Sequence, residues 1–313
     1  MVENLTEFIN AKKNVITNID PDGFFSFALL HKFFGCDLVG FTNSKDYVYL
    51  INGKDYSKNH VTYVDMYVCD PTIQSIDQHI VTYNQNENNE LIGYGTKLNP
   101  NIYHEHSFTN YKVKYPFSTF IYLCTLLEKE GYEIDIDWNK KITDDLDVGS
   151  ILLRIDGVLT NLADYTDNCI NWLKWSEQYC NGGKFIKDMK AYIDGSISVL
   201  QTKNISNRVE DYFKLRFHSE SKDGGYKSLR EDNFGYVLEF MKFAFEILNV
   251  DFNFTRKELS EMYVFEGGKN LSKPLDLKTR QDKLFSCAIV NMKENNLSYT
   301  NNVNYLKTIR FNE

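Results

Sequence analysis

The chain has 313 residues and a formal net charge of −8 at pH 7. Apolar residues make up 42% of the sequence and aromatic residues 15%, which is typical of a globular protein with one large or two ordinary cores. The acidic balance argues against a protein that only coats nucleic acid, because such proteins carry an excess of basic residues.

The cysteines and the first residues bear on location. Six cysteines, at positions 36, 69, 124, 169, 180 and 287, show no CxxC spacing, so we interpret them as reduced core residues. The opening sequence MVENLTEFINAKK lacks the apolar region of a signal peptide. The longest apolar runs are too short and too interrupted to span a bilayer. We therefore expect a cytoplasmic protein without membrane contact; an oligomer is compatible with the sequence but not indicated by it.

Strand and helix signals alternate over the first half of the chain. Asn14–Asn18 is predicted to be a buried strand and Phe24–Phe34 a helix. Such alternation favours a parallel sheet, so the expected fold class is α/β. Further short strands are predicted at Leu38–Phe41, Tyr47–Ile51, Val61–Asp65 and Ile76–Val81.

Helix signals dominate from residue 116 onward. Pro116 is suited to open a helix, because proline is tolerated at the first helical position. Asp144 or Asp145 is placed to cap a helix over Leu146–Ile155. Asn168–Tyr179 carries two tryptophans and is predicted to be a packed helix.

The Asn-Gly-Gly segment at 181–183 is the best candidate for a domain boundary. It divides the chain into residues 1–180, with the alternating pattern, and residues 181–313, which are predicted to be mainly helical. In the second part, Thr255 and Glu258 suggest a capping box. Phe285–Asn291 and Leu297–Thr300 have the pattern of a terminal hairpin.

The most informative segment is NVITNIDPDGFFS, at residues 14–26. It places Asp20 and Asp22 in the tight turn between a buried strand and a helix, and ligands of open α/β sheets bind at this end of the strands. Two carboxylates and Asn18 on one turn are costly to crowd together unless a cation neutralises the charge. Gly23 suits a turn that bends sharply or lets the backbone approach a ligand.

Three more acidic sites follow strand-like or apolar segments. They are Asp65 in VTYVDM, Asp77 with His79 in SIDQHIV, and Asp156 in SILLRIDGVLTN. Carboxylates and an imidazole at neighbouring strand ends are what a two-cation phosphoryl-transfer site needs.

Each of these residues also fits a plainer role. Asp20 and Asp22 belong to Asp-Pro and Asp-Gly pairs, which are common in turns. Asp65 can be a turn residue at the end of a strand, His79 a hydrogen-bonded core histidine, and Asp156 an acid without a role.

In order and spacing, these motifs resemble those of the DHH phosphoesterase superfamily, which includes RecJ-like exonucleases, oligoribonucleases and family II pyrophosphatases. NIDPDG at 18–23 resembles the first motif, often DxDxDG or HxDxDG, and VDM at 64–66 resembles the second. DQH at 77–79 resembles the Asp-His-His motif, and Asp156 is similar to the acid of the fourth. The resemblance covers residues 12–160.

The resemblance implies a metal centre with one or two Mn²⁺ or Mg²⁺ ions. By position, Asp20 and Asp22 would each hold one cation. Asp65 would bridge both ions, and Asp156 would complete one of the two sites.

It also implies that Asp65, Asp77 and His79 form the catalytic group, with His79 contacting phosphate. The sequence departs from the family at two expected metal positions. Asn18 stands where the family has His or Asp, and Gln78 where it has the first His of its motif. A carboxamide is a poor ligand for Mn²⁺ beside imidazole or carboxylate.

The expectation is therefore an N-terminal DHH-like domain on a parallel sheet, over which a mainly helical C-terminal domain closes. The implied function is that of a divergent metal-dependent phosphoesterase or nuclease. Its implied substrate is a short oligonucleotide or a nucleotide-type phosphodiester. One alternative is a catalytically degenerate module that binds a nucleotide or a protein partner without hydrolysis. A purely structural interaction protein is the third reading.

Overall fold

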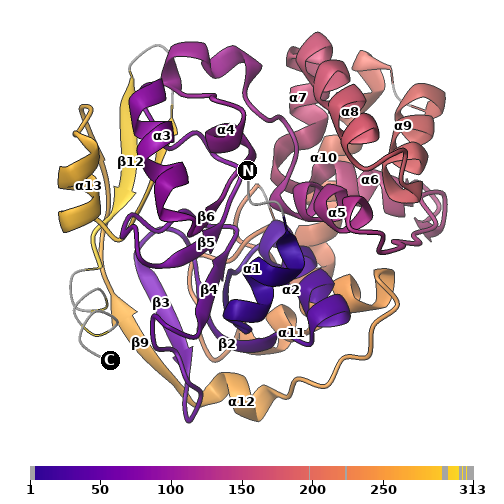
Figure 1. Cartoon of the computed structure of the whole chain (residues 1–313). Helices are drawn as coiled ribbons and strands as arrows, with labels where there is room; N and C mark the ends of the chain where they lie inside the picture. Colours follow the sequence, from indigo (N-terminus) through magenta and orange to yellow (C-terminus); the bar gives the residue numbers. More distant parts are fainter. Residues whose placement is uncertain are drawn as a thin grey trace.

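The structure is a computed structural model that describes residues 4–196, 198–222, 224–290, 295–302, 305 and 308. Strands and helices alternate over its first part (Figure 1). The elements up to residue 98 are α1 (Leu5–Ala11), β1 (Asn14–Asn18), α2 (Pro21–Phe34), β2 (Asp37–Thr42), β3 (Tyr47–Ile51), β4 (Val61–Val64), β5 (Gln74–Ile76), α3 (Gln85–Tyr94) and β6 (Lys97–Leu98).

These strands and β9 (Met262–Glu266) form the main sheet. Among the described residues, its strand order is β6-β5-β4-β1-β2-β3-β9. The strands from β6 to β2 run parallel to one another, whereas β3 and β9 are antiparallel to their neighbours. The protein is thus an α/β protein with a mostly parallel sheet, and the predicted fold class is confirmed at this level.

The turn between β1 and α2 is defined by residues at the start of the helix. Asp20 is the N-cap, and its Oδ1 accepts a hydrogen bond from Gly23 N at 3.0 Å. Pro21 occupies the first helical position, where no amide hydrogen is needed. A Cβ on Gly23 would lie 2.2 Å from Asn18 O, so only glycine allows the helix to begin this close to the strand.

Alternate residues of the central strands face two different cores. Val15 and Leu38 belong to the larger core, which also contains α2. Ile16 and Val39 point to the other face and pack in a cluster with Phe285. Both faces of the sheet are covered, which explains why its central strands are buried along nearly their whole length.

The helical part follows β6. Helices α5 to α10 gather at one side of the main sheet, and α11 packs against α2 (Figure 1). None of the helices in the described ranges has the length and apolar character needed to cross a membrane. The elements are α4 (Pro100–Tyr103), the 3₁₀ helix η1 (Phe108–Val113), α5 (Thr119–Lys129), β7 (Lys141–Thr143), β8 (Leu146–Asp147), α6 (Val148–Arg154), the 3₁₀ helix η2 (Ile155–Gly157), α7 (Val158–Asp164), α8 (Thr166–Tyr179), α9 (Lys184–Ser196), α10 (Val199–Phe217), α11 (Phe234–Ile247) and α12 (Arg256–Ser260).

The last elements form a small sheet beside the main sheet. They are β10 (Lys269–Ser272), α13 (Leu277–Lys283), β11 (Ser286–Val290) and β12 (Asn296–Thr300), and the small sheet has the order β10-β12-β11. The predicted terminal hairpin is confirmed, since β11 and β12 pair antiparallel; Asn291, included in its first strand, lies outside the described residues. The capping box of Thr255 and Glu258 is also present.

Residues beyond 183 therefore contribute β9 to the main sheet as well as helices and the small sheet. Backbone hydrogen bonds hold the small sheet to the rest of the fold: Cys69 N donates to Phe285 O at 2.8 Å, and Ile289 N donates to Ile80 O at 2.8 Å. The division of the chain at residues 181–183 stays a prediction.

Four local predictions were wrong. Helix α2 begins at Pro21 and not at Phe24, so Asp22 lies in its first turn. Pro116 does not open a helix, because α5 begins at Thr119 with Ser118 as its N-cap. The strand expected at Ile76–Val81 ends at Ile76, because Asp77 Oδ2 accepts a hydrogen bond from His79 N at 3.0 Å and turns the chain there. The helix expected at Leu146–Ile155 begins at Val148, and Asp147 caps it in place of Asp144 or Asp145.

Candidate functional site

A cleft of about 290 Å³ opens where the parallel strands end. Strands β1, β4 and β5 are neighbours, and their carboxyl ends supply one side of it. The small sheet forms another side, and the loop before α11 closes over it, with Tyr226 N donating to Ile19 O at 3.0 Å. The predicted site residues that line the cleft are Asn18, Asp20, Asp65, Asp77, His79 and Asp156.

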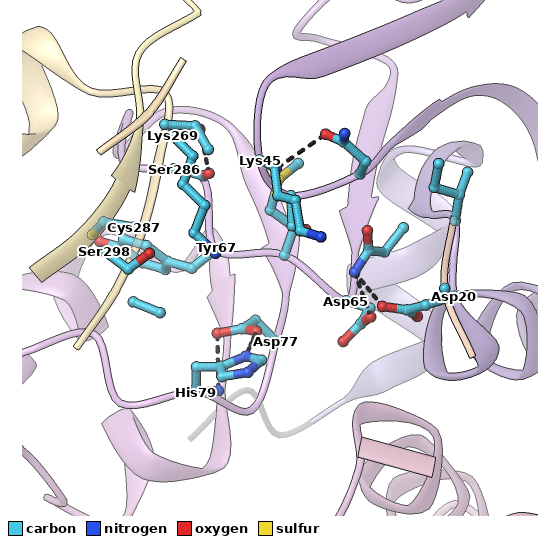
Figure 2. Close-up of a pocket in the computed structure, with 18 of the residues that line it drawn as sticks. Asp20, Lys45, Asp65, Tyr67, Asp77, His79, Lys269, Ser286, Cys287 and Ser298 are labelled. Atoms are coloured by element: carbon cyan, nitrogen blue, oxygen red, sulfur yellow. Dashed lines mark hydrogen bonds and ion pairs between the residues drawn. The ribbon is translucent and has the colours of Figure 1, made fainter. Parts of the chain in front are cut away.

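Asp65 directly follows β4 and has a φ of 59°, in the left-handed region that few residues other than Gly, Asn and Asp adopt. Asn18 Nδ2 donates to Asp65 Oδ2 at 3.2 Å and to Asp20 Oδ2 at 2.6 Å. The hydroxyl of Thr119, at the start of α5, donates to Asp65 Oδ1 at 3.1 Å. The amide of Asn18 thus joins the carboxylates of Asp65 and Asp20, which lie next to each other in Figure 2.

Asp22 does not line the cleft. It lies beneath it, 3% exposed, and its two oxygens accept hydrogen bonds at 2.8 Å from the amides of Thr119 and Phe120. Burial raises its pKa to about 7; the charges of Asp156 and Asp20 add to the rise, and the two amide donors oppose it. The structure thus places this predicted ligand at the N-terminus of α5.

The buried carboxylates repel one another. Burial raises the pKa of Asp65 well above its usual range, and the charges of Asp22 and Asp20 raise it further. Such a group of acids is stabilised by a proton, by amide donors or by a cation. Asn18 supplies one such donor.

Asp77 and His79 form a second pair in the cleft (Figure 2). The Asp77 carboxylate, 2% exposed, contacts His79 Nδ1 at 2.8 Å and accepts from Asn99 Nδ2 at 3.2 Å. Burial lowers the pKa of His79, but the Asp77 charge outweighs this and the pKa rises to about 9. The pair therefore presents a positively charged imidazole at neutral pH, which Asp77 orients.

Asp156 reaches the cleft from η2, with a φ of 49°. Gln78 does not line the cleft but lies behind Asp156, and its Nε2 donates to Asp156 Oδ2. Asn101 Nδ2 donates to the backbone oxygen of Gln78 at 2.6 Å and holds this segment in place. At both positions where the sequence departs from the family pattern, a carboxamide donates to a carboxylate.

The sequence analysis did not single out the basic residues of the cleft. Lys45 comes from the loop between β2 and β3, and Lys269 from the start of β10. Lys269 lies beside Ser286 on the side of the small sheet, away from Asp65 and Asp20 (Figure 2). A turn lysine and a lysine after two glycines give no local signal that separates them from ordinary solvated lysines.

The donor types at the cleft fit a hard divalent cation. Carboxylate oxygens are the ligands that Mg²⁺ and Mn²⁺ prefer, and the acids lining the cleft include Asp20, Asp65 and Asp156. In the side-chain positions of the described residues, no group of three or more His, Cys, Asp or Glu is arranged to hold a metal ion. The hydrogen bond from Gln78 to Asp156 and those from Asn18 to Asp20 and Asp65 would have to break before these carboxylates could bind a cation together.

Comparison of the chain with models of known protein families, with curated proteins and with solved structures finds no match. The resemblance to DHH phosphoesterases stays a prediction from the sequence motifs.

Proposed function

We propose that this protein is a divergent metal-dependent phosphoesterase of the DHH type, which acts on short oligonucleotides or nucleotide-type phosphodiesters. In this proposal residues 1–180 form the DHH-like domain, and residues 181–313 close over the strand ends and bind the substrate or a partner.

The observation that supports the proposal most strongly is the convergence of residues from distant parts of the chain. Asp20, Asp65, Asp77 with His79, and Asp156 come from four segments and line one cleft at the carboxyl ends of parallel strands. Ligands of open α/β sheets bind at this edge. Four carboxylates beside an imidazole suit phosphoryl chemistry assisted by a cation.

Each residue has a role that follows from its contacts. Asp65 and Asp20 are the carboxylates best placed to hold one or two Mn²⁺ or Mg²⁺ ions, with Asp156 completing a site. Such ions would neutralise charge on the phosphoryl oxygens and lower the pKa of a water. His79, positively charged and oriented by Asp77, binds a phosphate oxygen.

A second candidate function is favoured by the carboxamides. Asn18 and Gln78 donate hydrogen bonds to the acids that the mechanism needs. A cleft stabilised in this way can bind a nucleotide, or a protein partner, without hydrolysing a bond. Activity and cation binding separate the two functions.

The test is hydrolysis of bis-p-nitrophenyl phosphate and of a dinucleotide with Mn²⁺ present. We expect activity in the native protein and a rate at least about 100-fold lower in Asp65→Asn. Loss of a residue that only supports a metal ligand costs up to about 100-fold, so loss of the proposed ligand itself should cost at least as much. The matched control is Asp137→Asn, an exposed acid outside the cleft, which should keep full activity.

Thermal melts and calorimetric titration with Mn²⁺ complete the experiment. Asp65→Asn should melt at or above the temperature of the native protein, because it removes one charge from a repelling group. Equal rates in a folded Asp65→Asn variant would refute the proposed mechanism. Nucleotide binding without hydrolysis and without Mn²⁺ uptake would favour the second function.

A further inference from the structure

Two lysines share the cleft with the acids, and the backbone around both is firmly held. Asn43 Oδ1 accepts hydrogen bonds at 3.0 Å from the amides of Lys45, Asp46 and Tyr47, which shapes the loop that carries Lys45. Gly267 N, two residues before Lys269, donates to Asp46 O at 2.5 Å. The two lysines therefore lie on segments that a backbone hydrogen bond joins.

Neither ammonium group is held in an ion pair with a described residue. In the described part of the chain, no carboxylate lies within ion-pair distance of either ammonium group. Asp46, the closest acid in sequence, accepts a hydrogen bond from Asn43 Nδ2 at 2.7 Å. Partial burial and the charge of Lys45 lower the pKa of Lys269, and the charge of Asp46 opposes this in part. An anion between them would relieve this repulsion.

The charges and the size of the cleft indicate which kind of ligand would carry such an anion. Lys269 lies with Ser286 on the small-sheet side, Asp65 and Asp20 lie on the other side, and Lys45 projects into the space between (Figure 2). A volume of about 290 Å³ is at the lower end for small-molecule sites, so the cleft suits a short ligand and not a duplex. A ligand that spans the cleft meets acids at one end, Lys45 midway and Lys269 at the other end.

We propose that Lys45 and Lys269 form an anion subsite that binds the terminal phosphate of a short oligonucleotide while its phosphodiester lies at Asp65. The inference rests on the proposed function and deepens it, because it makes the preferred substrate one with a free terminal phosphate. The hydroxyls of Ser286 and Ser298 line the same side and can donate to the phosphate oxygens.

Binding is measured first, without turnover. The Asp65→Asn variant is titrated in a calorimeter with the 5′-phosphorylated dinucleotide pTpT and with unphosphorylated TpT. We expect pTpT to bind at least about 10-fold more tightly, since a hydrogen bond between charged groups is worth at least this factor. Adding Lys45→Gln and Lys269→Gln should abolish the preference and leave TpT binding unchanged. The control Lys257→Gln, an exposed lysine on α12, should retain it.

Kinetics on the protein with Asp65 intact form the second arm. In the variant with both lysines changed to Gln, KM for pTpT should be about 10-fold higher than in the native protein, and kcat/KM for TpT should be unchanged. The melting temperature of this variant should match that of the native protein, because both lysine side chains face solvent in part. A binding preference without any hydrolysis would support the subsite and refute the phosphoesterase. Equal affinity for pTpT and TpT, or a preference that survives both lysine changes, would overturn the subsite.

Discussion

Replacement of Asp22 by Asn is expected to stabilise the protein above neutral pH in the absence of divalent cations. Asp22 is 3% exposed and shares its surroundings with Asp156 and Asp20, and these conditions raise its pKa to about 7. The native state therefore holds the proton on Asp22 more tightly than the unfolded chain does. The stability that this group contributes is fully present below pH 4 and is lost as the pH rises through 7.

The magnitude follows from the same shift. A rise from 3.8 to about 7 corresponds to roughly 4 kcal/mol at pH 8, because each pKa unit is worth about 1.4 kcal/mol. Asn keeps the shape of the side chain but gives up one of the two hydrogen bonds from the amides of Thr119 and Phe120, at a cost of about 1.5 kcal/mol. The expected net gain in the free energy of unfolding is about 2.5 kcal/mol at pH 8.

Urea denaturation in the presence of EDTA, from pH 5 to pH 8, measures this difference. The advantage of Asp22→Asn should be largest at pH 8 and should disappear or change sign near pH 5. Mn²⁺ should raise the stability of the native protein more than that of the variant, since a cation relieves the same repulsion. A stability difference that is constant from pH 5 to pH 8 would refute the reasoning, and Asp137→Asn, outside the cleft, should show no such pH dependence.

Two further substitutions test the local structure by thermal or urea unfolding. Gly23→Ala should destabilise the protein by about 2 kcal/mol or more, because its Cβ would lie 2.2 Å from Asn18 O; a loss under about 0.5 kcal/mol would mean that the turn opens easily. Burial raises the pKa of Asp147, but hydrogen bonds from Ser150 and Tyr192 outweigh this and lower it. The stability that the Asp147 charge contributes is therefore present above pH 4 and is lost as the pH falls further. Asp147→Ala should destabilise the protein by about 1 kcal/mol at pH 7, and this loss should shrink toward pH 3. A loss of the same size at pH 3 would contradict this account.

Much of the fold could be predicted because its signals are local. The apolar run of β1 and the alternation of strands with helices depend on residues within a few positions of one another. The position of Asp65 at the end of β4 followed in the same way. Where the local rules failed, a nearby side chain competed: Asp77 ends β5 early by accepting a hydrogen bond from His79 N.

The candidate site, too, could be predicted only where its signals are local. The sequence by itself determined which acids follow strands, because a short apolar run followed by a polar turn is read from neighbouring residues. Only the tertiary structure decided which of them face the cleft, since that depends on segments far along the chain. The amides at the start of α5, about a hundred residues away, draw Asp22 out of the cleft, and the small sheet brings Lys269 to the end opposite Asp65. Contacts between such distant residues form only when whole elements pack together, so no local pattern encodes them.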